Sequence, residues 1–136
     1  MGDPQQEYTE ASNNHRHYSA LRFASLTLYF AIIGALAAVA FGVNEPSSSV
    51  IDIKRWATVA GFLVTVAFFL FEVLNEMNLR HFSDVLKNLE SSLGYTQMTS
   101  RSDHPAMRAR TATYTLFILF VGFWLYALVQ TFKDAI

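Results

Sequence analysis

Three long apolar runs constrain this chain more than any other feature of its sequence. They cover residues 21–43, 56–74 and 112–132, so each holds between 19 and 23 residues. At about 1.5 Å of rise per residue, a helix of that length spans roughly 28–35 Å, close to the ~30 Å hydrocarbon core of a bilayer. Backbone groups in that core must bond to one another, so each run is predicted to be a transmembrane α-helix.

The charge content supports a membrane location. Only 15% of the 136 residues are charged and 52% are hydrophobic, whereas a typical soluble domain is about 25% charged. We therefore predict an all-α integral membrane protein with three transmembrane helices, whose first partner is the lipid bilayer. A net charge of −1 gives no basis for a nucleic-acid partner, and the absence of Cys excludes disulfides and thiolate metal sites.

The remaining segments are short and polar. We expect residues 1–14 to be poorly ordered on their own, since they combine Asp, Pro, Gln, Glu, Ser and Asn. The predicted segments outside the spans are a polar N-terminal segment at 1–20, a short external loop at 44–55, an amphipathic helix at 75–94, a loop with the start of the third helix at 95–111, and a tail at 133–136.

The second helix is predicted to extend beyond the bilayer as a cytoplasmic amphipathic helix. Apolar residues recur there at helical spacing and form one stripe, and Gly94 is a typical C-terminal stop. We predict one helix over residues 54–93, while a bend near Asn75–Asn78 would instead lay the last part along the bilayer surface. The stripe is expected to be an interface for a partner, and its members are Phe82, Leu86, Leu89 and Leu93.

Orientation follows from the positive charges. The N-terminal segment, counted together with Arg22 at the start of the first span, and the loop between the second and third spans hold seven Lys and Arg, while the first loop and the tail hold three. Because cytoplasmic loops are enriched in Lys and Arg, the N-terminus is predicted to be cytoplasmic and the C-terminus external. The layout resembles that of many small bacterial inner-membrane proteins, which suggests that location.

One acidic residue lies inside a predicted span. Glu72 falls just inside the cytoplasmic border of the second span, and Arg22 enters the first span at a similar depth. Intramembrane charges usually have a partner, so an Arg22–Glu72 ion pair is the favoured interpretation. The alternatives are a proton or cation site formed by Glu72 with Glu76, one turn away, and snorkelling of the charges to the lipid headgroups.

Small residues recur at four-residue spacing in two spans. Gly34, Ala38 and Gly42 form one series, and Ala57 and Gly61 begin another. Small residues let membrane helices approach closely, so both series are candidates for helix packing. They either pack the first two spans together within one chain or face another subunit, and two such faces favour self-association.

Sequence motifs for catalysis or cofactor binding are absent. The chain has no Ser/His/Asp set, P-loop, Gly-x-Gly-x-x-Gly or His-Glu-x-x-His, and its few histidines do not supply the four convergent ligands of a zinc site. We therefore expect no enzyme, cofactor or metal. The expected function is a structural or accessory subunit of a membrane assembly, as a homo-oligomer or within a larger complex. The alternative is a homo-oligomeric pore with a hydrophobic gate.

Overall fold

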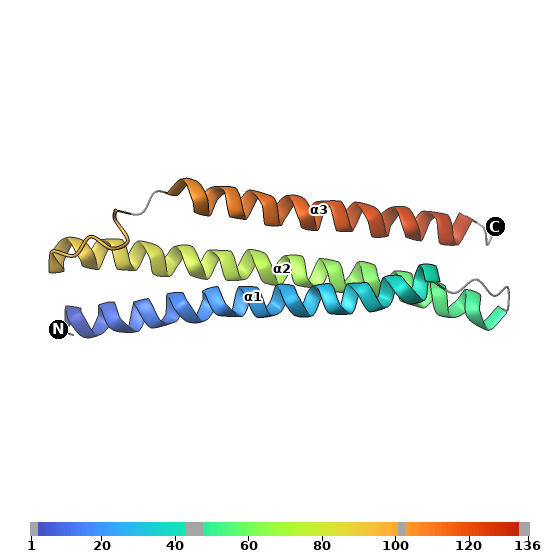
Figure 1. Ribbon diagram of the computed structural model, residues 1–136, viewed down its shortest axis with the longest axis horizontal. Helices are drawn as coiled ribbons and strands as arrows, with labels where there is room; N and C mark the ends of the chain where they lie inside the picture. The colour runs from blue at the N-terminus through green and yellow to red at the C-terminus, as the bar shows by residue number, and fades with distance from the viewer. Residues whose placement is uncertain (1–2, 43–47, 101–102, 134–136) are drawn as a thin grey trace.

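Three long helices make up the part of the chain that the structure describes. The computed structural model describes residues 3–42, 48–100 and 103–133, in which α1 covers Pro4–Gly42, α2 covers Ser48–Leu93 and α3 covers Asp103–Lys133. The helices run antiparallel in sequence order, with α2 between α1 and α3 (Figure 1). The N-terminus therefore lies at the same end as the end of α2 and the start of α3.

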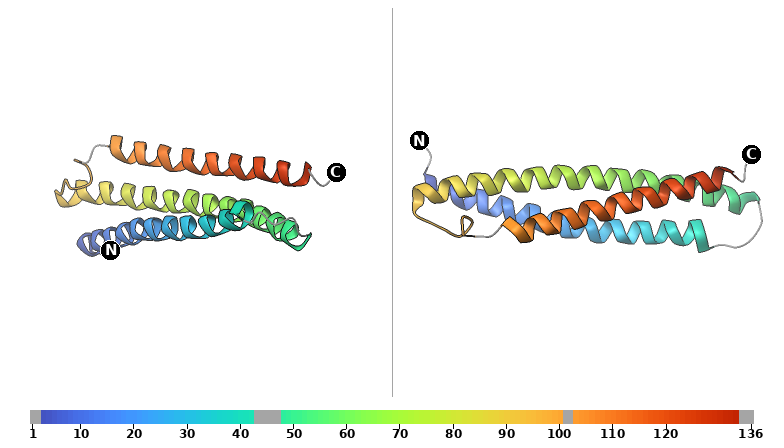
Figure 2. Two further views of the ribbon diagram at one scale, coloured as in Figure 1. Left: turned by 45° about the vertical axis from the view of Figure 1, so that its right-hand side comes forward. Right: turned by 90° about the horizontal axis from the view of Figure 1, so that it is seen from above.

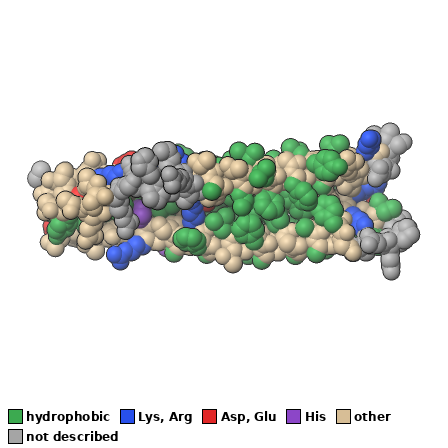
Figure 3. Space-filling view, turned by 45° about the horizontal axis from the view of Figure 1, so that its top comes forward, with side chains coloured by type: hydrophobic (Ala, Val, Ile, Leu, Met, Phe, Trp, Pro, Cys, Tyr) green, Lys and Arg blue, Asp and Glu red, His purple; other side chains and the backbone are tan. Residues whose placement is uncertain are grey.

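The prediction of an all-helical chain with three long helices is confirmed for the described residues. Each helix is long and apolar enough to cross a membrane by length and composition. On the face shown in Figure 3, hydrophobic side chains gather over the middle of the molecule, and Lys and Arg lie toward its two ends. This distribution is the one expected of a membrane-spanning bundle.

The first helix begins much earlier than predicted. The Asp3 carboxylate accepts a hydrogen bond from the Gln5 backbone N–H at 3.0 Å, and Pro4 occupies the first helical position. A capping Asp followed by Pro is a strong helix start. The expectation that residues 1–14 are poorly ordered is therefore wrong for residues 4–14, which are helical, and the predicted 1–20 segment belongs almost entirely to α1.

The second helix is a single element of 46 residues. It starts at Ser48, so most of the predicted 44–55 loop is helical, and it continues without a break through Asn75–Asn78. It ends as predicted at Gly94, whose φ is +71°, with the Tyr95 N–H donating to the Glu90 carbonyl at 3.1 Å. This Schellman geometry satisfies a carbonyl that the last helical turn leaves open.

Several predictions fall on parts of the chain outside the description. These are residues 44–47 of the predicted external loop, the side chains of Arg101 and Arg108 that entered the charge count, and residues 134–136 of the tail.

A seven-residue repeat marks the side of α2 that packs on α1 and, at Gly61, on Trp124 of α3, and we call this side the seam. Two sets of α2 positions, each spaced by seven, contain no exposed residue among the ten. Such a repeat is typical of helices that wrap around each other with a left-handed supercoil. The first set is Thr58, Thr65, Glu72, Leu79 and Leu86, and the second is Gly61, Phe68, Asn75, Phe82 and Leu89.

The seam includes the amphipathic stripe that was expected to bind a partner. Leu86 is only 2% exposed, Phe82 stacks on Tyr18 of α1 with ring centroids 5.6 Å apart, and Leu89 and Leu93 are half-buried. The expectation of an uncovered stripe at Phe82, Leu86, Leu89 and Leu93 is corrected here, because the N-terminal half of α1 is helical and packs on it.

The third helix packs differently from the first two. Figure 2 shows it crossing over the α1–α2 pair at a shallow angle, and its backbone does not closely approach that of α1 in the described residues. Large rings fill the space instead, with Tyr29 of α1 centred 5.0 Å from Phe117 of α3. Trp124 lies fully buried over Gly61, where a Cβ atom would be 2.5 Å from the indole ring.

Candidate functional site: an ion-pair layer across the three helices

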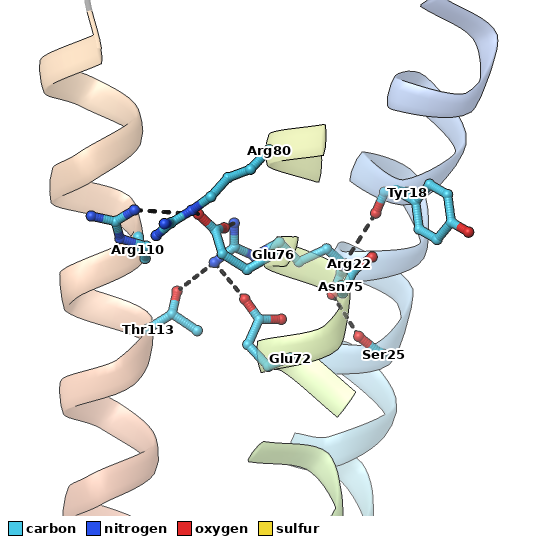
Figure 4. Close-up of polar contacts among 9 residues, drawn as sticks. All are labelled: Tyr18, Arg22, Ser25, Glu72, Asn75, Glu76, Arg80, Arg110 and Thr113. Atoms are coloured by element: carbon cyan, nitrogen blue, oxygen red, sulfur yellow. Dashed lines mark hydrogen bonds and ion pairs between the residues drawn. The ribbon is translucent and has the colours of Figure 1, made fainter. Parts of the chain in front are cut away.

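The structure brings together the two residues that were expected to pair inside the membrane. The Arg22 guanidinium of α1 contacts the Glu72 carboxylate of α2 through Nη2 and Oε1 (Figure 4). Glu72 is 1% exposed. A carboxylate this deeply buried needs a counter-charge, because removing it from water costs several kcal/mol without one.

Glu76, one turn along α2, gathers arginines from all three helices. Its Oε2 lies 3.3 Å from Arg22 Nη1, and its Oε1 accepts from Arg80 Nε at 3.1 Å and lies 3.7 Å from Arg110 Nη1 of α3. Arg22 therefore bridges the two carboxylates, and Arg110 ties α3 to the same layer. We call these five residues the ion-pair layer: Arg22, Glu72, Glu76, Arg80 and Arg110.

Uncharged groups complete the layer. Arg22 Nη2 also donates to the Thr113 hydroxyl of α3 at 3.4 Å, and Asn75 Nδ2 donates to the Tyr18 carbonyl of α1 at 3.3 Å. Deeper in the bundle, the Tyr29 and Thr65 hydroxyls are hydrogen-bonded at 3.3 Å. Polar contacts between membrane helices stabilise their association by about 1 kcal/mol each, so this seam fixes the register of α1 on α2.

The charges in the ion-pair layer nearly balance. Three arginines face two glutamates, which gives +1 when all five are ionised. Each carboxylate contacts a guanidinium, an arrangement that favours a structural clamp over an open proton or cation site. Within the described residues, Glu72 Oε2 and Asn75 Oδ1 have no hydrogen-bond partner, and no three His, Cys, Asp or Glu side chains cluster as a metal site.

The two small-residue series have opposite environments. Ala57 and Gly61 are buried, and Gly61 makes room for Trp124. Gly34, Ala38 and Gly42 are exposed on α1, and a Cβ atom at Gly34 or Gly42 would meet nothing within 4 Å. The first series therefore packs the chain internally, and the second is presented outward.

A second buried carboxylate, Glu90, was missed by the sequence analysis. It is 0% exposed near the end of α2. It accepts backbone hydrogen bonds from Met98 at 2.7 Å and Thr99 at 2.8 Å, a further bond from the Thr99 hydroxyl, and one from the Tyr8 hydroxyl of α1 at 3.1 Å. Its position one turn after Leu86, on the buried stripe, is the signal that could have identified it.

The hydrogen bonds around Glu90 control its protonation. Burial acts to raise the pKa of Glu90, but the bonds donated by Thr99, Met98 and Tyr8 outweigh it and lower the pKa to about 2. Burial raises the pKa of Tyr8, and the hydrogen bond from its hydroxyl to Glu90 raises it further. Glu90 is therefore a carboxylate that holds the 95–100 segment and the start of α1 together.

Comparison of the chain with protein-family models, with curated proteins and with solved structures gave no match. A role for the chain has therefore to be inferred from its own residues and their contacts. Three features are available for this inference. They are the ion-pair layer, the Glu90 carboxylate that binds the 95–100 segment, and the exposed series of small residues on α1.

Proposed function

We propose that this chain is a non-enzymatic structural subunit of a membrane assembly and that it self-associates through the exposed small-residue face of α1. The observation that carries the proposal is the outward position of Gly34, Ala38 and Gly42, which no other helix covers in the described residues. Small residues at this spacing let two membrane helices approach closely enough for van der Waals packing to hold them.

The ion-pair layer supports the same role. A subunit that presents a helix face to a neighbour has to hold that helix in one position, and Arg22 clamps α1 to both other helices. Two buried polar side chains of α2, Glu72 and Thr65, contact side chains of α1, so a structural role is favoured over a conducting one. A ring of copies around an open axis would favour the hydrophobically gated pore instead.

The subunit composition of the particle tests the proposal. The full chain is reconstituted in lipid nanodiscs, and its mass is measured by native mass spectrometry. We expect a multimer for the unmodified chain and a shift to monomer for Gly34→Leu and Ala38→Leu. Gly122→Leu is the matched control, because Gly122 is an exposed glycine of α3 with nothing within 4 Å of a Cβ atom and large neighbours one turn away. A monomeric unmodified chain would contradict self-association.

The proposed location is the inner membrane of a bacterial cell, with the ion-pair layer on the cytoplasmic side. By sequence, seven of the ten Lys and Arg belong to residues 1–22 and 75–111, which is the distribution of cytoplasmic loops. Since the chain has no Cys, single-cysteine labelling tests the orientation. Asn13→Cys should be protected from an impermeant thiol reagent in intact cells, and Lys133→Cys should react. The reverse pattern would invert the assignment.

A further inference from the structure

An apolar groove of about 410 Å³ opens on the side of the α1–α2 pair, and α3 does not line it. Small side chains create the hollow, since Ala24 of α1 and Ala67 of α2 lie between larger neighbours. The volume is in the range of about 300–1,000 Å³ that ligand sites occupy. The apolar walls are Leu21, Leu28, Phe68 and Phe71.

The lining offers almost no polar group to a ligand. Ser25 is its one polar side chain, and its hydroxyl already donates to the Arg22 carbonyl at 2.9 Å. A polar solute would lose its hydrogen bonds to water on entering and gain none. The lining therefore favours an apolar occupant over a polar solute.

A row of four rings lies beyond the end of the groove that is nearer the start of α1. His17 contacts Tyr18, Tyr18 stacks on Phe82, and Phe82 contacts His81, with ring centroids 5.7, 5.6 and 5.5 Å apart. His17 lies one helical turn before Leu21 of the groove, and both histidines are exposed. Aromatic rings with a polar edge favour the headgroup level of a bilayer, and imidazole N–H groups can donate to a phosphate.

The groove and the ring row lie at successive depths on the same two helices. We propose that the groove binds one acyl chain of a phospholipid, whose phosphate lies at the level of His17 and His81. The depth order supports this occupant, because the groove lies within the apolar stretches of α1 and α2 and the rings lie beyond the ion-pair layer, toward the polar end. This site shares no residue with the proposed self-association face.

Lipid retention tests the proposal directly. The full chain is ejected from nanodiscs of mixed phosphatidylcholine and phosphatidylglycerol, and the phospholipids kept per chain are counted by native mass spectrometry. We expect one tightly held lipid. Ala67→Leu or Ala24→Leu would displace about two methylene groups from the groove and reduce the lipid-bound fraction about tenfold. Ala112→Leu, at an exposed alanine of α3 outside the groove, is the matched control and should retain the lipid.

A second variant separates the acyl chain from the headgroup. His17→Ala combined with His81→Ala leaves the groove lining intact, so we expect a lipid to remain bound with a retained fraction about threefold lower, as for the loss of a single hydrogen bond. An unmodified chain that retains no lipid, or equal retention in Ala67→Leu and Ala112→Leu, would overturn the proposal. A changed number of subunits in Ala67→Leu at constant lipid count would identify a second copy as the occupant and overturn it as well. The Gly34→Leu experiment measures the number of subunits and changes a different face of α1. The self-association proposal and the lipid proposal can therefore fail independently of each other.

Discussion

Two glutamates on one face of α2 are equally buried and are held in opposite ways. Glu72 and Glu90 are 18 residues apart, which is five helical turns, and are 1% and 0% exposed. Glu72 contacts a guanidinium, while Glu90 accepts hydrogen bonds from two backbone N–H groups and two hydroxyls, none of them charged. Inside an apolar stretch only a counter-charge balances a carboxylate, whereas at the polar end a folded loop can supply enough donors.

Removal of Arg22, the counter-charge of Glu72, should have the largest effect on the stability of the bundle. Arg22→Ala leaves a buried carboxylate without its cation and also removes a contact to Glu76, so we expect it to lower the free energy of unfolding by about 3–5 kcal/mol. The measurement is unfolding of the chain in mixed detergent micelles with increasing denaturing detergent. Glu72→Gln alone should cost less, because it removes the charge that needs the partner.

The double variant Arg22→Ala/Glu72→Gln decides whether the two residues act as a pair. If they do, the loss in the double variant is well below the sum of the two single losses. Additive losses would show that Arg22 and Glu72 stabilise the bundle independently, and the contrast with Glu90 would then disappear.

The packing of the span region, as distinct from its charges, is tested at Gly61. A Cβ atom there would be 2.5 Å from the buried Trp124 ring, so Gly61→Ala should lower the free energy of unfolding by about 1–3 kcal/mol through overpacking. Gly122→Ala is the matched control and should be neutral or stabilising by up to about 1 kcal/mol, since Ala favours a helix and a Cβ atom at Gly122 meets nothing within 4 Å. An equal response at both glycines would mean that Trp124 moves aside.

At Glu90 the expected effect is local and depends on pH. With a pKa of about 2 against an ordinary value of 4.5, ionised Glu90 contributes its full stabilisation above about pH 4.5, and the contribution is lost as the pH falls through about 2. Glu90→Gln should therefore show a shallower loss of thermal stability between these pH values than the unmodified chain. Parallel pH curves for the two proteins would remove Glu90 as the cause.

The smallest effect on stability should come from Tyr8, which donates a hydrogen bond to Glu90. Tyr8→Phe removes one of the four hydrogen bonds to Glu90 and keeps the edge contact with Tyr95. We expect limited proteolysis to cut the 95–100 segment faster, with no change in thermal stability of the span region, because the start of α1 opens locally. Faster cutting within the spans as well would indicate that α1 unfolds as one unit.

The features that could be predicted from the sequence are those that depend on position along the apolar runs. The three helices follow from the length of the apolar runs, and the Arg22–Glu72 contact follows from two charges at matching positions along the first two runs. Arg110 and Thr113 could not be placed, because the rotation of α3 about its axis depends on a loop and on ring packing at Tyr29 and Phe117. The length of α1 could have been predicted, since Asp3 and Pro4 are a capping signal that a polar composition obscured.

The contact between Tyr8 and Glu90 joins residues that are 82 positions apart. During synthesis at about 5–20 residues per second, the ribosome needs roughly 4–16 s to pass from one to the other. The first four turns of α1 therefore leave the ribosome long before their docking surface on α2 exists, and they wait until the first two spans and the following loop have been made. Any factor that binds the chain during synthesis meets these turns of α1 in their undocked form, and they dock on α2 only after α2 is complete.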